Sequence, residues 1–180
     1  MMFYLSVKLM IQKAQRLFIA ALFSSIIFVT NFFVPPPISY LLIVVQAVIL
    51  ALATFFVGKA GATYVGLVGG VLSVLARSGF GPFTFLFTFL FGVMVDVFAL
   101  IFRVGPAKDK VNQNRVMLTM AFSTAIIGFL SYYVFAVYLR IVEFNLMMSG
   151  LVLFVALGSG ISAGYAAAYL WNKYLNSIHA

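Results

Sequence analysis

Few residues of this chain could carry out acid–base, redox or metal chemistry. The sequence contains no cysteine, and its single histidine is His179. Its acidic side chains are limited to Asp96, Asp109 and Glu143. Thiolate metal sites and paired-histidine ligation are therefore excluded, and general acid–base catalysis has few candidate groups. We expect no metal site, no cofactor and no enzymatic activity.

Asp96 is the one ionisable residue well inside an apolar segment. It lies six residues before Phe102, which corresponds to about 9 Å along a helix axis. An unpaired acid at this depth costs about 2.5–3.5 kcal/mol, so we expect Asp96 to have a partner. The nearest candidate cations are Arg103, Lys59 and Arg115. A structural ion pair or polar contact is the favoured interpretation, and direct handling of a ligand or proton is the alternative.

A second group of polar residues lies near one set of ends of the apolar segments. Aromatic walls with a few orienting polar groups suit a pocket for a flat or amphiphilic small molecule, although tyrosines at such positions also form interfacial belts. The predicted substrate-binding residues are Asn31, Arg77, Thr84, Thr88, Tyr132, Tyr133, Glu143 and Asn145. Because adjacent helical residues point about 100° apart, only one of Tyr132 and Tyr133 should line the pocket.

Two patterns resemble nucleotide-binding motifs without their context. Gly58-Lys59 is similar to the end of a P-loop, but Ala53 stands where that motif needs its first glycine, and Ala60 follows the lysine. The run from Gly158 to Ala163 has the spacing of a dinucleotide-binding turn, yet it lies inside a long apolar segment with no strand before it. Any ATP that the function needs must therefore bind another subunit.

The elements that position these residues are apolar helices. The chain of 180 residues is 65% hydrophobic and 8% charged, whereas a soluble domain carries about 25% charged residues. A membrane-spanning helix needs about 20 apolar residues, and we count six such runs. They are Leu17–Val34, Ile38–Gly58, Ala60–Ala76, Pro82–Phe102, Val116–Leu139 and Leu146–Trp171. The sequence thus predicts an all-α integral membrane protein with six spans in one domain, 1–180, preceded by a short interfacial lead.

The distribution of Lys and Arg predicts the orientation in the membrane. One side collects Lys8, Lys13, Arg16, Lys59, Arg103, Lys108, Lys110, Arg115 and Lys173, and the other collects Arg77 and Arg140. Since cytoplasmic loops carry the excess of basic residues, both termini should be cytoplasmic and the polar mouth should face outside. The net charge of +8 then faces anionic lipid, and we expect no nucleic-acid partner.

Small residues at helical spacing predict close helix contacts. Ala62, Gly66 and Gly70 form one such ladder, and Gly160, Gly164 and Ala168 form another; for both we expect packing inside the bundle. In the first span, Ala20 and Ser24 share one register, while Ala21 and Ser25 share the next. For these four residues a protein partner is nearly as good an explanation as internal packing.

The order of these features resembles a known family. A six-helix membrane protein of this size, with the runs GATYVGLVGG, SGISAGYAAAYL and GFGPFTFLFTFLFGVMVD, looks like the substrate-binding (S) component of an energy-coupling factor (ECF) vitamin transporter. The resemblance covers about residues 15–175. Where that family has two alanines four residues apart in its first helix, this chain has Ala20 and Ser24.

The resemblance implies a function in uptake at the cell membrane. Such a protein captures a vitamin or vitamin-like molecule from outside, and it works with a transmembrane coupling protein and two ATPase subunits. Two alternatives remain open. One is a non-catalytic structural subunit of a membrane complex, and the other is a small secondary carrier built from two inverted three-helix repeats.

Overall fold

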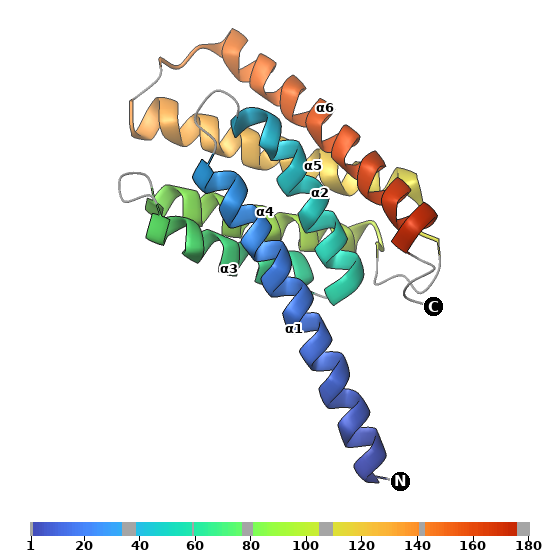
Figure 1. The fold of residues 1–180 in the computed structure, drawn as a ribbon. Coiled ribbons are helices and arrows are strands. Elements are labelled where there is room, and N and C mark those ends of the chain that lie inside the picture. The colour runs from blue at the N-terminus through green and yellow to red at the C-terminus, as the bar shows by residue number, and fades with distance from the viewer. Residues whose placement is uncertain are drawn as a thin grey trace.

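The computed structural model describes residues 2–33, 39–58, 60–76, 81–104, 110–140 and 143–175, with side chains left undescribed at 2–13, 31–33, 39–42 and 76. All regular structure in these residues is helical, which confirms the all-α prediction (Figure 1). The elements are α1 (Met2–Phe33), α2 (Ser39–Val57), α3 (Gly61–Ala76), α4 (Gly81–Ile101), α5 (Gln113–Tyr133) with the π-helical η1 (Val134–Tyr138), and α6 (Leu146–Leu170) with the π-helical η2 (Trp171–Leu175).

Three of these helices are long and apolar enough to cross a membrane. They span Gly81–Ile101, Gln113–Tyr138 and Leu146–Leu175. The described parts of the other three helices, Ala14–Thr30, Ile43–Val57 and Gly61–Leu75, are also apolar but shorter. Three apolar helices of this length indicate a membrane protein.

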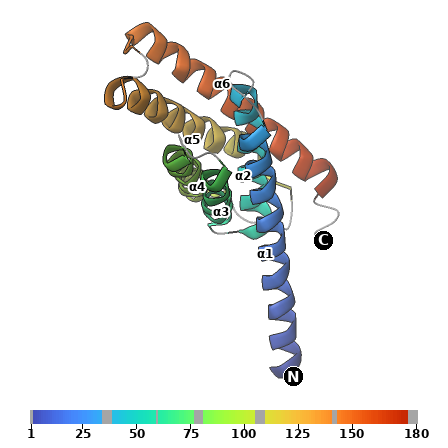
Figure 2. The ribbon, with the colours of Figure 1, turned by 60° about the vertical axis from the view of Figure 1, so that its left-hand side comes forward.

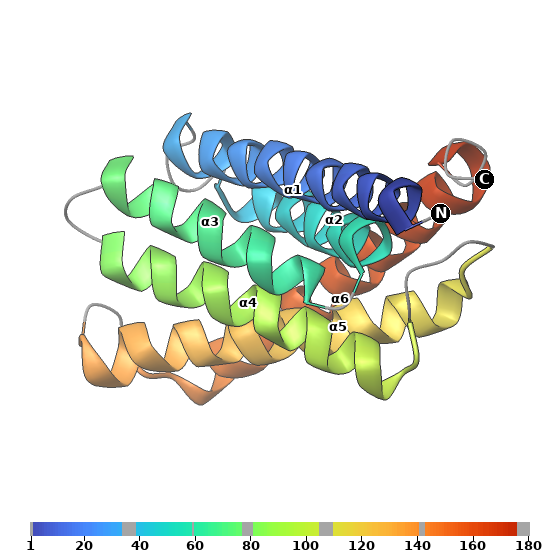
Figure 3. The same cartoon turned by 90° about the horizontal axis from the view of Figure 1, so that it is seen from below.

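The helices are arranged around α2. This helix contacts each of the other five α-helices. The others lie along its sides in the order α1, α3, α4, α5 and α6, and each contacts the next. Figure 3 shows α1, α3, α4 and α5 in that order from top to bottom. The helix η2 also packs against α2. Trp171 is fully buried, and its ring centroid lies 5.3 Å from that of Phe55 and 4.9 Å from that of Phe56 in α2.

Two helices of the structure begin before the predicted membrane spans that they contain. The expected interfacial lead before Leu17 belongs to α1, which begins at Met2 and extends away from the bundle (Figures 1 and 2). Among the described side chains, Leu17 and Phe18 are 72% and 70% exposed, and Ala20 is the first buried residue. The fifth helix begins at Gln113 rather than Val116, because the side chain of Asn112 accepts a hydrogen bond from the amide of Asn114 and caps a polar first turn.

Small residues bring two helix pairs into close contact. In α3 and α4, a Cβ on Gly66 would lie 2.7 Å from the carbonyl oxygen of Thr88, and one on Gly92 would lie 2.9 Å from the carbonyl carbon of Ala62. In α5 and α6, a Cβ on Gly164 would lie 2.7 Å from the Cα of Met117. The predicted internal packing of the third and sixth spans is confirmed, because both ladders are buried. The nucleotide-like run Gly158–Ala163 therefore has a packing role in α6, because its Gly160 lies against the backbone of α5.

Gly92 and Gly150 offer a matched test of this packing. We expect Gly92→Ala to lower the free energy of unfolding by about 1–3 kcal/mol, because its methyl group overlaps the α3 backbone. Gly150 has nothing within 4 Å of an added Cβ, so Gly150→Ala should be neutral or should stabilise α6 by about 0.5–1 kcal/mol. Thermal unfolding of both variants in the same detergent measures the difference. Equal midpoints would contradict the close contact between α3 and α4.

Candidate functional site

Asp96 lies at a junction of three helices. Its Oδ2 accepts hydrogen bonds from the amide and the hydroxyl of Thr63, each at 2.7 Å. Its Oδ1 accepts from the amide of Ala62 at 3.3 Å and from the hydroxyl of Thr54 at 3.4 Å. The residue is 8% exposed. A carboxylate of α4 thus joins the N-terminus of α3 to the C-terminal half of α2.

The local fold explains why α3 needs this carboxylate. The connection from α2 turns sharply at Gly58 (φ 90°), and Ala60, with φ 65°, directly precedes the helix. Ala62 and Thr63 are the second and third residues of α3, so their amides have no partner within the helix. A carboxylate at this position accepts hydrogen bonds from both amides, and the positive end of the helix dipole stabilises its negative charge. Asp96 therefore caps α3 from a neighbouring helix.

The expected ion pair of Asp96 is not formed among the described residues. Arg103 and Arg115 are exposed, and Lys59 lies outside the described part of the chain. Arg103 ends α4 in a left-handed conformation (φ 54°), with the amide of Val104 donating to Ala99 at 2.7 Å. This Schellman-type ending turns the chain out of the helix. The partners of Asp96 are amides and hydroxyls. Of the two favoured interpretations, an ion pair or a polar contact, the structure therefore shows the polar contact.

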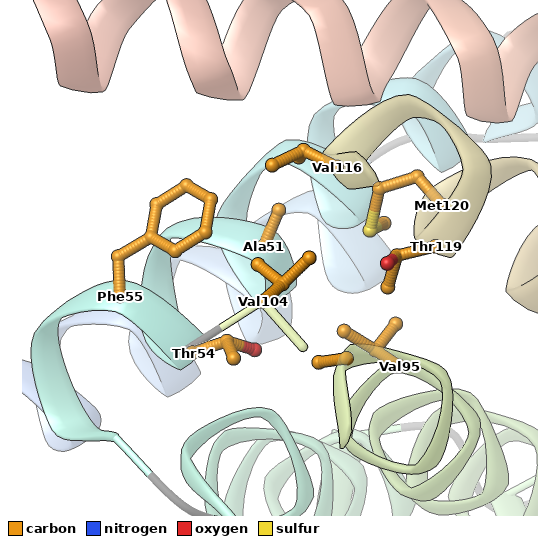
Figure 4. Close-up of a pocket in the computed structure, with 9 residues that line it drawn as sticks. Ala51, Thr54, Phe55, Val95, Val104, Val116, Thr119 and Met120 are labelled. Carbon is orange, nitrogen blue, oxygen red and sulfur yellow. The ribbon is translucent and has the colours of Figure 1, made fainter. Parts of the chain in front are cut away.

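A small cavity lies beside Thr54, in the half of the bundle that holds the C-terminal end of α4. It is lined by Thr54 and Phe55 of α2, Val95 of α4, Val104, and Thr119 and Met120 of α5, among others (Figure 4). Its interior has room for no more than about one water molecule, whereas ordinary small-molecule sites have volumes of roughly 300–1,000 Å³. Sequence reasoning did not anticipate this cavity, and it has no room for a vitamin-sized ligand.

The structure brings three of the predicted substrate-binding residues together in the hairpin of α5 and α6. The hydroxyl of Tyr132 accepts from the amide of Asn145 at 3.1 Å and lies 3.3 Å from the Asn145 carbonyl and 3.4 Å from the Glu143 carbonyl, to either of which it can donate. The side chain of Asn145 also caps α6 by accepting from the amide of Met147. Tyr133 points elsewhere and is 46% exposed. The two tyrosines therefore have different surroundings.

Thr88 lies in the contact between α3 and α4 and not in this hairpin. Thr88 is buried, its hydroxyl donates to the carbonyl of Thr84, and its own carbonyl lies against Gly66 of α3. Contacts of Phe83 and Phe87 with Phe135 of η1, at 6.3 and 6.1 Å between ring centroids, place the start of α4 and the end of α5 at the same end of the bundle.

Two further predicted residues could not be placed. The side chain of Asn31 and the whole of Arg77 lie outside the described residues.

The predicted partner face of α1 divides into a buried and an exposed half. Ser24 is fully buried, and its hydroxyl lies 2.8 Å from the carbonyl of Ala20 and 3.2 Å from that of Val65 in α3. Ala20 is also buried, whereas Ala21 and Ser25 are exposed. A partner protein can therefore reach Ala21 and Ser25, but Ala20 and Ser24 serve the contact with α3.

The comparisons with known proteins add no relative to this description. A scan against protein-family models, a search of curated proteins and a search of solved structures each found no match.

The cap of α3 can be tested by changing either partner. We expect Asp96→Asn to lower the free energy of unfolding by about 1–3 kcal/mol, because the amide nitrogen cannot accept a hydrogen bond and leaves buried donors unpaired. Thr63→Val should also destabilise the protein, whereas Thr63→Ser keeps the hydroxyl and should lose less. Thermal unfolding in detergent measures all three variants. An unchanged midpoint for both Asp96→Asn and Thr63→Val would show that Asp96 does not hold α3.

Proposed function

We propose that the chain is the membrane-embedded substrate-binding (S) component of an ECF-type importer for a vitamin or vitamin-like small molecule. In this proposal all six helices span the cell membrane and both termini are cytoplasmic. The helices α2 and α3, with 19 and 16 residues, are about 28 and 24 Å long. Such lengths are close to a hydrocarbon core of about 30 Å, and α1 is long enough to cross the core and continue beyond it.

The observation that carries the proposal is the exposed register of Ala21 and Ser25 on α1. These small residues lie on the outside of the bundle beside exposed Leu22, Ile26 and Val29. A partner helix can approach closely over small side chains in lipid. The buried register of Ala20 and Ser24 already contacts α3, so the exposed one remains for a transmembrane coupling protein. That partner, with two ATPase subunits, would supply the energy.

The proposed ligand site lies at the outer end of the bundle, where the hairpin of α5 and α6 meets the start of α4. Tyr132 fixes this hairpin through its hydrogen bonds to the backbone at Asn145, so its ring would form a ligand wall while Tyr133 faces lipid. Thr84 would contribute from α4. The cavity beside Thr54, at the other end, has room for no more than about one water molecule, so it is too small to compete with this location.

A structural subunit of a membrane complex is the second candidate. It is favoured by the exposure of α6, the least buried of the three long apolar helices. Leu146, Met147 and Phe154 are among its most exposed side chains. A helix face of this kind could contact further subunits instead of lipid.

The proposal predicts that bulk on the exposed α1 register separates the chain from its partners. Wild-type protein purified from its native membranes should carry a transmembrane subunit and two subunits with ATPase activity. Ala21→Leu and Ser25→Leu should lose these subunits while keeping the wild-type unfolding midpoint, because both positions are exposed. Ser162→Leu is the matched control, since it places the same side chain at an exposed small residue of α6.

Two experimental outcomes would contradict the proposed function and support one of the alternatives. Solute uptake by the purified chain alone in liposomes, driven by an ion gradient, would identify a secondary carrier. Copurified membrane subunits without any ATPase would identify a structural subunit.

A further inference from the structure

A group of tyrosines holds Lys173 in place at the end of α6. The Lys173 ammonium donates to the hydroxyl of Tyr169 at 2.6 Å, and it lies 5.1 and 5.3 Å from the ring centroids of Tyr169 and Tyr174. The ring of Tyr165 stacks on that of Tyr169 with 6.3 Å between centroids. All four side chains are exposed. The cation is thus held at the hydroxyl edge of Tyr169 and lies within about 6 Å of the Tyr174 ring, the distance at which cation–aromatic contacts are favourable.

The fold brings a second lysine to the same region. The side chain of Asn172 accepts from the amide of Val111 at 2.7 Å and donates to its carbonyl at 2.9 Å. This pair joins the segment before α5 to η2, and Lys110 and Lys173 are the sequence neighbours of the two bonded residues. Lys110 is exposed. Lys173 has no acidic residue near it in the sequence, whereas Lys110 follows Asp109, which lies outside the described residues.

The length of the last helix places this surface in the lipid headgroup layer. Leu146–Leu175 contains 30 residues, or about 45 Å of helix. A hydrocarbon core is about 30 Å thick, and the whole bilayer is about 40–45 Å thick. Lys173 lies two residues before the end of this segment, and Tyr165 lies eight residues before Lys173. With the core centred on this segment, Tyr169 lies near the hydrocarbon boundary, Tyr165 lies deeper in the core, and Lys173 lies just beyond the boundary among the headgroups.

We propose that Tyr165, Tyr169, Lys173 and Tyr174, with Lys110, form a binding site for the phosphate of an anionic phospholipid headgroup. The Lys173 ammonium has three donors, and its contacts with the hydroxyls of Tyr169 and Tyr174 leave one for a phosphate oxygen. The tyrosine rings would contact the glycerol and upper acyl region. Charge complementarity selects an anionic lipid over a zwitterionic one, because the exposed Lys173 bears a positive charge and has no acidic residue near it in the sequence. Anionic lipid would fix the depth and tilt of α6.

The test measures lipid-dependent stability of the purified full-length chain. Thermal unfolding in detergent, followed through the emission of Trp171, the single tryptophan, is recorded with increasing phosphatidylglycerol or phosphatidylcholine. Phosphatidylglycerol should raise the midpoint and phosphatidylcholine should not. Lys173→Gln should weaken the apparent affinity for phosphatidylglycerol about fivefold, as expected for one basic residue near an anionic surface. Lys110→Gln should weaken it less, and Tyr174→Leu should weaken it by removing one ring from Lys173.

Arg16→Gln is the matched control, because it removes the same charge from an exposed position on the projecting part of α1. Its affinity for phosphatidylglycerol should equal that of the wild type. The proposal is wrong if Arg16→Gln weakens binding as much as Lys173→Gln, which would show general charge attraction. It is also wrong if both lipids stabilise the chain equally, or if soluble glycerol phosphate at the same concentration stabilises it as much as phosphatidylglycerol does.

Discussion

The contact between the Asp96 carboxylate and the N-terminus of α3 is the constraint on which much of the bundle depends. In a membrane, no water is present to satisfy the free amides at the start of a helix. The short connection after α2 leaves Ala62 and Thr63 with such amides inside the bundle, and Asp96 accepts from both. The carboxylate in turn obtains the hydrogen bonds that make its burial acceptable. Asp96 therefore satisfies the free amides of α3, and these amides in turn stabilise the buried carboxylate.

This contact also fixes how α3 and α4 are aligned. With Asp96 opposite Thr63, the antiparallel helices place Gly92 opposite Ala62, Thr88 opposite Gly66, and Phe85 opposite Gly70. If α3 shifted by one residue along α4, side chains would replace these glycines and would overlap the backbone of the facing helix. Thr54 extends the same junction to the central helix α2. A second close pair, α5 with α6, depends on Gly160 and Gly164 and is joined to α2 through Trp171.

The sequence allowed the helices and their close contacts to be predicted, but it did not determine which faces meet. Apolar runs and glycine spacing depend on local chemistry, so the six helices and the two buried ladders could be inferred. Asp96 was correctly expected to need a partner, but the candidate partners named from the sequence were cations, because the start of α3 becomes adjacent only through tertiary packing. Thr63 at the third position of a helix after a glycine turn was the available signal. On α1, two adjacent registers of small residues look alike in sequence, and only the position of Val65 shows that Ser24 is the buried one.

In the proposed function, this chain binds a small molecule within the membrane on behalf of an importer. Native mass spectrometry of the purified protein, released gently from detergent, tests it most directly. The account predicts a 19.8 kDa chain carrying one noncovalent small molecule that is lost on unfolding and whose retention falls in Tyr132→Ala but not in Tyr133→Ala. A bare chain after purification from cells supplied with a rich mixture of vitamins, with no mass added by any of them in titration, would contradict the account.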